Sequence, residues 1–119
     1  MPQLVPAPTR IPVPGGKTID EYVGHVTTST PEVSVAHMVA PAGWDEPAQT
    51  PDFDEITVVL RGVVLVEHDA GVLEVAAGQA VITRAGERVR YSTAAGEGAE
   101  YVAVCLPAFS PQAVHRDAS

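Results

Sequence analysis

Short apolar runs ended by glycine or proline dominate the chain from Asp20 onward. The runs are rich in Val, Ile and Thr and recur at intervals of roughly ten residues, a spacing typical of an all-β sandwich or barrel. None of them has a helical period. The pattern predicts strands at about 21–28, 33–40, 55–60, 62–68, 71–76, 80–83, 88–93 and 100–106.

Glycines mark the ends of several of these strands. Arg61-Gly62, Asp69-Ala70-Gly71, Ala77-Gly78 and Ala85-Gly86 each place a glycine where a tight connection requires a positive φ. We therefore expect short hairpins.

The run Ile56–Leu60 is apolar on both faces. Thr57 and Val59 point to one side of a strand, and Ile56, Val58 and Leu60 point to the other. A strand with two apolar faces is covered on both sides. The second cover is either a second copy of the chain, in a homodimer, or the N-terminal segment folded back over the sheet.

The first sixteen residues hold five of the eleven prolines together with Gly15 and Gly16. Such a segment cannot form a helix and does not suit a central strand. We predict an extended N-terminal arm over 1–19, one β-barrel domain over 20–110 and a polar C-terminal tail over 111–119.

Composition excludes several classes of partner. The chain has 119 residues, enough for one domain, and 15 acidic against 7 basic residues give a net charge of −8. This charge opposes binding to nucleic acid and to anionic membranes. Cys105 is the only cysteine, so no intrachain disulfide forms, and no segment has the length and composition of a signal peptide or membrane span. We expect a cytoplasmic protein.

Three segments together resemble the cupin superfamily. Pro41-Ala42-Gly43 is similar to the turn before the first cupin motif, and Asp54–Gly62 (DEITVVLRG) is similar to the core of that motif. Gly78–Val89 (GQAVITRAGERV) follows the second motif, except that Arg84 replaces its proline. The resemblance covers about 32–107 and implies an all-β cupin barrel, also called a double-stranded β-helix or jelly roll.

The family pattern places its four metal ligands at Gln49, Pro51, Glu55 and Val89. Proline and valine offer no side-chain donor, and an amide is a poor substitute for imidazole toward first-row transition metals. A tight three-histidine site is therefore excluded, and we expect no cofactor. The segment from Tyr91 to Ser110 resembles the small, single-domain cupins of the ethanolamine-utilisation type, which implies a compact barrel that is commonly dimeric.

The alternation of side chains selects the residues of the barrel interior. If Val89 faces inward, so does Tyr91, and the same rule applied from Glu55 turns Thr57 inward. Burial would raise the pKa of Glu55 and suit it to general acid or base catalysis, with Tyr91 as a second catalytic candidate. In the alternative interpretation, backbone amides or an arginine hold Glu55 and it only stabilises the barrel mouth.

Four further residues are candidates for ligand binding. Gln49 occupies a ligand position, and its amide both donates and accepts hydrogen bonds. Trp44 either stacks on a ligand or covers the edge of the core, and Glu46 either supplements Glu55 or is a solvated loop acid. His37 either faces the cavity or is a hydrogen-bonded core or rim residue. Lys17, the sole lysine, lies in the arm, so we do not expect Schiff-base chemistry.

Two functions fit these residues. The first is metal-free binding of an unknown small molecule by Gln49, Glu55 and Tyr91. The second is a small isomerase, lyase or cyclase in which Glu55 transfers a proton and Tyr91 polarises the substrate. A variant of the second uses a weak divalent metal held by Glu55, Gln49 and His37. The fold alone does not choose between them.

Overall fold

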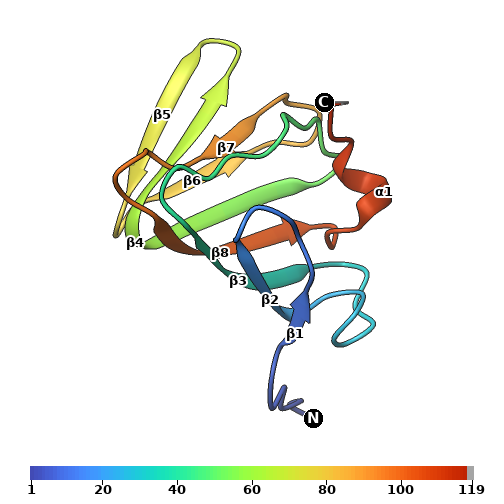
Figure 1. Ribbon diagram of the computed structural model, residues 1–119. Helices are drawn as coiled ribbons and strands as arrows, with labels where there is room; N and C mark the ends of the chain where they lie inside the picture. The colour runs from blue at the N-terminus through green and yellow to red at the C-terminus, as the bar shows by residue number, and fades with distance from the viewer. Residues whose placement is uncertain (118–119) are drawn as a thin grey trace.

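Antiparallel strands make up almost all of the regular secondary structure in the computed structural model, which describes residues 1–117 (Figure 1). The elements are β1 (Thr9–Ile11), β2 (Thr18–Val23), β3 (Ser34–Ala40), β4 (Asp54–His68), β5 (Gly71–Ala76), β6 (Ala80–Thr83), β7 (Arg90–Ser92), β8 (Ala99–Leu106) and the short helix α1 (Pro111–Val114). Hydrogen bonds connect the strands in the order β1-β2-β3-β8-β4-β5, and β6 and β7 also pair with β4. The predicted all-β fold is confirmed.

Strand β4 belongs to both faces of the barrel. Its first half pairs with β6 and β8, and its second half pairs with β5 and β7. Gly62 lies between the halves at φ 76°, and a Cβ there would lie 2.0 Å from the carbonyl oxygen of Gly98. The predicted positive φ is correct, but the predicted turn at Arg61-Gly62 is wrong, because the strand bends and continues.

Strand β2 begins three residues before its predicted start and ends at Val23 instead of 28. Gly24 turns the chain at φ 153°, and its carbonyl oxygen accepts hydrogen bonds from the backbone N–H groups of Thr28 and Thr30. The buried carboxylate of Glu21 accepts bonds from the backbone and the hydroxyl of Thr27. These contacts hold 24–30 as a loop where a strand was predicted.

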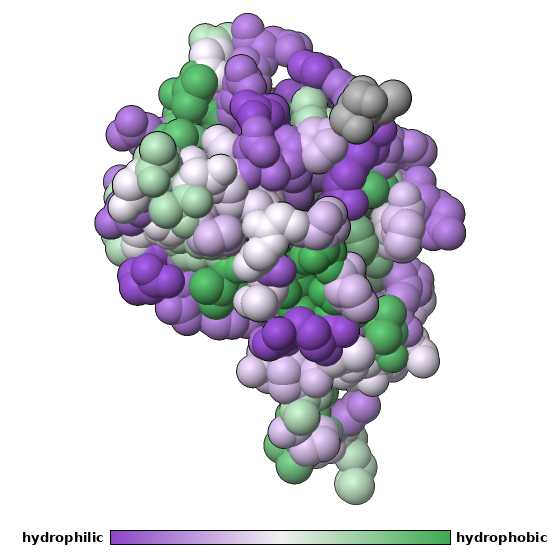
Figure 2. All heavy atoms as spheres, viewed as in Figure 1, coloured by the Kyte–Doolittle hydropathy of each residue, from purple (hydrophilic) through white to green (hydrophobic). Residues whose placement is uncertain are grey.

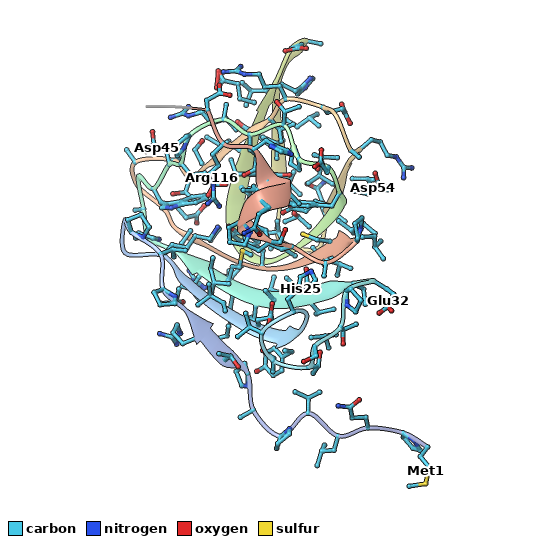
Figure 3. All side chains as sticks on the ribbon, turned by 90° about the vertical axis from the view of Figure 1, so that its right-hand side faces the viewer. Met1, His25, Glu32, Asp45, Asp54 and Arg116 are labelled. Carbon is cyan, nitrogen blue, oxygen red and sulfur yellow. The ribbon has the colours of Figure 1, made fainter. Side chains whose placement is uncertain are left out.

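The N-terminal segment is only partly an arm. Strand β1 pairs with β2 at the edge of the sheet, where the prolines that follow it break no central ladder. Thr18 and Ile19, which we assigned to the arm, belong to β2. Residues before β1 project from the rest of the molecule, with Met1 at the far end (Figures 1, 2 and 3).

The predicted polar tail contains structure as well. Ser110 caps helix α1, where its hydroxyl accepts a bond from the N–H of Ala113. Val114 of this helix packs with Phe53 and Cys105. The last two residues of the predicted tail, 118 and 119, lie outside the described residues.

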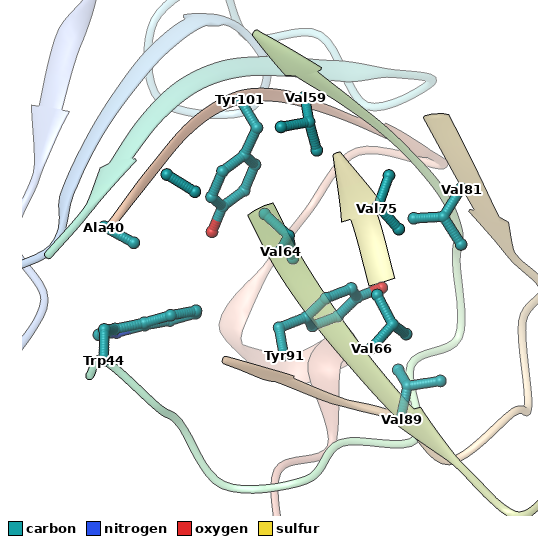
Figure 4. Packing of buried hydrophobic residues seen from close by; sticks show 11 residues of the cluster. Ala40, Trp44, Val59, Val64, Val66, Val75, Val81, Val89, Tyr91 and Tyr101 are labelled. Carbon is teal, nitrogen blue, oxygen red and sulfur yellow. The ribbon is translucent and has the colours of Figure 1, made fainter. Parts of the chain in front are cut away.

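The core lies between the two faces of the barrel and contains Ala40, Trp44, Val59, Val64, Val66, Val75, Val81, Val89, Tyr91, Ala99 and Tyr101 (Figure 4). The predicted directions on β4 are confirmed: Thr57 and Val59 are buried, whereas Val58 and Leu60 are 38% and 52% exposed. The arm therefore leaves much of the outer face uncovered, contrary to the alternative in which it folds back over the sheet. Among the described residues, no helix has the length and apolar character needed to cross a membrane.

Candidate functional site

A cavity enters the barrel beside the edge formed by β1, β2 and β3. Its empty volume, which includes open solvent at the mouth, is about 760 Å³. Much of the wall is apolar and includes Ile11, Ile19, Met38, Ala103 and Phe109. The polar and charged groups that line it include Lys17, Glu21, Glu46, Gln49, Glu55, Tyr91 and Arg116.

Glu55 lies on the inner face of β4 and is 9% exposed. Burial, which penalises the charged carboxylate, raises its pKa to about 7, and the nearby charge of Glu46 adds to this effect. Lys17 and a long hydrogen bond of 3.5 Å from the hydroxyl of Thr57 act in the opposite direction. Within residues 1–117, Glu55 forms no ion pair, so the alternative in which an arginine holds it is not observed.

Tyr91 extends from β7 into the same cavity and is 4% exposed. Its hydroxyl lies 3.0 Å from the hydroxyl of Thr83. Burial and the charge of Glu55 raise the pKa of Tyr91 far above its ordinary value, so the phenol stays protonated and can act as a hydrogen-bond donor. Glu55 and Tyr91 both line the cavity, as predicted, whereas Thr57 does not line it and reaches the site only through its hydrogen bond to the Glu55 carboxylate.

Gln49 is held in the cavity wall by two backbone hydrogen bonds to Val89, of 2.8 and 2.9 Å. Pro51 and Val89, at two of the other family ligand positions, are also buried. Across the described part of the chain, no group of three or more His, Cys, Asp and Glu side chains is arranged to hold a metal ion. The donors at these positions therefore do not fit the metal that the cupin motif implies.

His37 does not reach the cavity. Ser34, Ala36 and Met38 occupy the inner face of β3, so His37 lies on the outer face. There its Nε2 is 2.6 Å from a carboxylate oxygen of Glu100. Of the two alternatives for His37, the hydrogen-bonded residue is observed, so its assignment as a ligand-binding candidate is corrected, and the weak-metal set of Glu55, Gln49 and His37 is not assembled.

The two loop candidates have different environments. Glu46 lines the cavity with its side chain 16% exposed, and its carboxylate lies 3.9 Å from the guanidinium of Arg116. Trp44 is 5% exposed and packs in the core, in agreement with the alternative in which it covers the core edge. Figure 4 shows Trp44 and Tyr101 directed into the barrel interior.

Four further lining residues were not predicted as site residues. Tyr101 and Cys105 lie on the inner face of β8, and burial raises the pKa of both groups. Arg116 comes from the predicted tail. Lys17 comes from the predicted arm. Its direction could have been predicted from the alternation of side chains, because Lys17, Ile19 and Glu21 all line the cavity.

The fold and this interior cavity define a cupin-type barrel. Solved structures of this fold are similar over most of the chain. The polyketide cyclase RemF from Streptomyces resistomycificus matches with a TM-score of 0.77 and 17% identity, over 100% of this chain and 87% of the other. Streptomyces PAC13, solved as a variant with uridine, matches with a TM-score of 0.76 and 16% identity, over 97% and 88%.

A putative ethanolamine utilisation protein, EutQ from Salmonella typhimurium, has a TM-score of 0.62 and 20% identity, over 78% of this chain and 71% of the other. At such identities the three likenesses show the fold alone. No protein-family model matches the sequence. A Myxococcus xanthus protein named endoribonuclease YbeY is 42% identical over 107 residues, which are 90% of this chain. The match covers 36% of that protein, so this chain spans about a third of its length.

Proposed function

We propose that the protein binds a small organic molecule in the barrel interior without a metal. The observation that carries this proposal is the lining of the cavity. Gln49, Glu55 and Tyr91 all face it, while the family's metal positions hold only one good ligand. Apolar walls with a few polar groups are the common composition of small-molecule sites.

Each polar group has a distinct part in this proposal. Gln49 lines the cavity, and its side-chain amide can both donate and accept hydrogen bonds toward a ligand. Tyr91 supplies a hydrogen-bond donor, and Glu55 supplies a group that is half-protonated near neutral pH. Glu46 and Arg116 line the same cavity and favour a ligand with a polar end.

A thermal-shift screen of small acids, sugars and polyketide-like aromatics tests this proposal. We expect at least one class to raise the melting temperature, and Gln49→Ala to weaken its binding about tenfold through loss of a buried hydrogen bond. Gln79→Ala is the matched control, because Gln79 is exposed and outside the cavity. An equal loss in both variants, or no shift with any compound, contradicts the proposal.

A second candidate function is proton transfer by Glu55. The observation that favours it is a pKa of about 7, since a general acid or base acts best when its pKa is near the working pH. Glu55 would give or take the proton while Tyr91 donates a hydrogen bond to a developing oxyanion. If a bound compound is turned over, we expect Glu55→Gln to abolish turnover and keep binding; retained turnover rejects this candidate.

We do not extend the name endoribonuclease to this chain. The relative is about two and a half times as long, and we propose that its nuclease activity belongs to another part. The net charge of −8 supports this view, because phosphate backbones repel acidic surfaces. We expect no change in fluorescence anisotropy when the protein is added to labelled single-stranded RNA at low salt. Binding that weakens as salt is added contradicts the expectation.

A closer relationship to the ethanolamine-utilisation cupins and a cytoplasmic location also remain predictions.

A further inference from the structure

Lys17 brings an amine into the cavity from the N-terminal edge. Gly15 and Gly16, at φ 85° and 78°, turn the chain immediately before it, and Thr18 begins β2 immediately after it. The alternation along β2 then directs Lys17 inward with Ile19 and Glu21. The turn and the strand pairing therefore fix the direction of the only lysine in the chain.

Two aromatic rings contact this amine, and the carboxyl groups of Glu46 and Glu55 line the same cavity. Its Nζ lies 4.2 Å from the ring centroid of Trp44 and 5.3 Å from that of Tyr101. Among the described residues, the ion pairs of the structure do not include this amine. Burial lowers the pKa of Lys17, although the charges of Glu46 and Glu55 oppose the change. Amines in apolar pockets are activated nucleophiles because a larger fraction is unprotonated.

We propose that Lys17 is a reactive amine that forms an imine with a small aldehyde or ketone bound in the cavity. The proposal rests on the cavity being a ligand site, as proposed above, and it names the class of ligand. Ile11, Val13, Met38 and Phe109 in the wall favour a carbonyl compound with an apolar body.

Glu55 supplies the proton that imine formation requires. The unprotonated Nζ attacks the carbonyl carbon, the C=O electrons move to oxygen, and a proton passes from nitrogen to that oxygen to give a carbinolamine. The carboxyl of Glu55 then gives its proton to the hydroxyl group, which leaves as water. The products are a protonated imine on Lys17, one water and the Glu55 carboxylate. A pKa of about 7 makes Glu55 a suitable acid for this step near neutral pH.

Reductive trapping tests the proposal. The native protein is incubated at pH 7 with benzaldehyde or butanal and sodium cyanoborohydride, which supplies the hydride that reduces the imine to a stable amine. Peptide mass spectrometry then measures the adduct at Lys17 and at the Met1 amine over time. Because the chain has no other lysine, the assignment is unambiguous.

The reference is an exposed lysine in the same fold, obtained by combining Lys17→Met with Arg84→Lys; the Arg84 side chain is 68% exposed. We expect Lys17 in the native protein to react on the order of tenfold faster than this reference, because the pocket holds the carbonyl beside the amine. We also expect Glu55→Gln to slow the reaction. If the double variant does not fold, native protein unfolded in urea supplies the exposed reference.

Labelling of Lys17 no faster than the reference overturns the proposal. If thermal shift or calorimetry detects binding of the same aldehydes while Lys17 reacts no faster, the imine proposal fails and the small-molecule site stands. If no compound of any class binds and Lys17 is not preferentially labelled, both proposals fail.

Discussion

Glu55 illustrates how a single buried residue links function to stability. Its pKa rises from an ordinary value of 4.5 to about 7 because folding removes the carboxylate from water. The folded protein therefore binds this proton more tightly than the unfolded chain. The contribution to stability is complete below about pH 4.5 and is lost as the pH rises through 7.

We predict that Glu55→Gln removes this part of the pH dependence. In the native protein, the raised pKa of Glu55 lowers the free energy of unfolding by about 3 kcal/mol between pH 4.5 and 8. Urea unfolding at several pH values measures it, and Glu87→Gln, at an exposed acid, is the control. The free energy of unfolding should fall more steeply with rising pH in the native protein than in Glu55→Gln. Equal slopes would contradict a raised pKa of Glu55.

Residue directions were predictable wherever a strand was correctly located. Alternation turned Glu55, Thr57 and Tyr91 inward, and the structure agrees. Alternation was not applied to Lys17, because the predicted strand began only at 21, whereas pairing with β3 extends β2 back to Thr18, next to Lys17. His37 was left undecided because the apolar residues around it gave β3 no clear inner face.

At the scale of the element, β4 positions the site by bending between the two sheets. The sequence marked this point as a turn, since a glycine after an apolar run is the usual signal of a strand end. The pairing of β4 with strands on both sides of the bend, which are distant in the sequence, is what keeps the strand continuous. Such long-range pairing is not visible in a local pattern.

Gly62→Ala tests the bend. A Cβ at φ 76° costs about 1–2 kcal/mol, and its clash with the backbone oxygen of Gly98 adds about 1–3 kcal/mol. Gly78→Ala is the matched control, because φ is 86° there and no atom lies within 4 Å of the added Cβ. Denaturant unfolding should therefore rank Gly62→Ala as the less stable variant. Equal losses would contradict the close packing at the bend.

At the scale of the whole molecule, the barrel presents an apolar outer face centred on β4, β6 and β8. Its exposed members include Val58, Leu60, Ile82 and Leu106. The face is bordered by Glu100, which pairs with His37 and Arg61. An apolar centre with a polar rim is the usual composition of a protein interface, and a second copy presents the same face.

We expect a homodimer through this face. Leu60→Lys should shift the molar mass measured by light scattering toward the monomer, because it places a charge in the apolar centre. Val72→Lys, at a residue that is 58% exposed on β5, should leave the mass unchanged. A native protein that is monomeric at micromolar concentration, or an equal effect of both substitutions, would contradict this interface.

We propose above that the cavity binds its ligand without a metal. Calorimetry tests this proposal most directly, by titrating a compound identified in the screen into protein treated with EDTA and into protein supplied with Fe, Mn, Ni or Zn. We predict the same Kd in every case. Binding that appears only with a metal, and disappears with it in Glu55→Ala, would contradict the account.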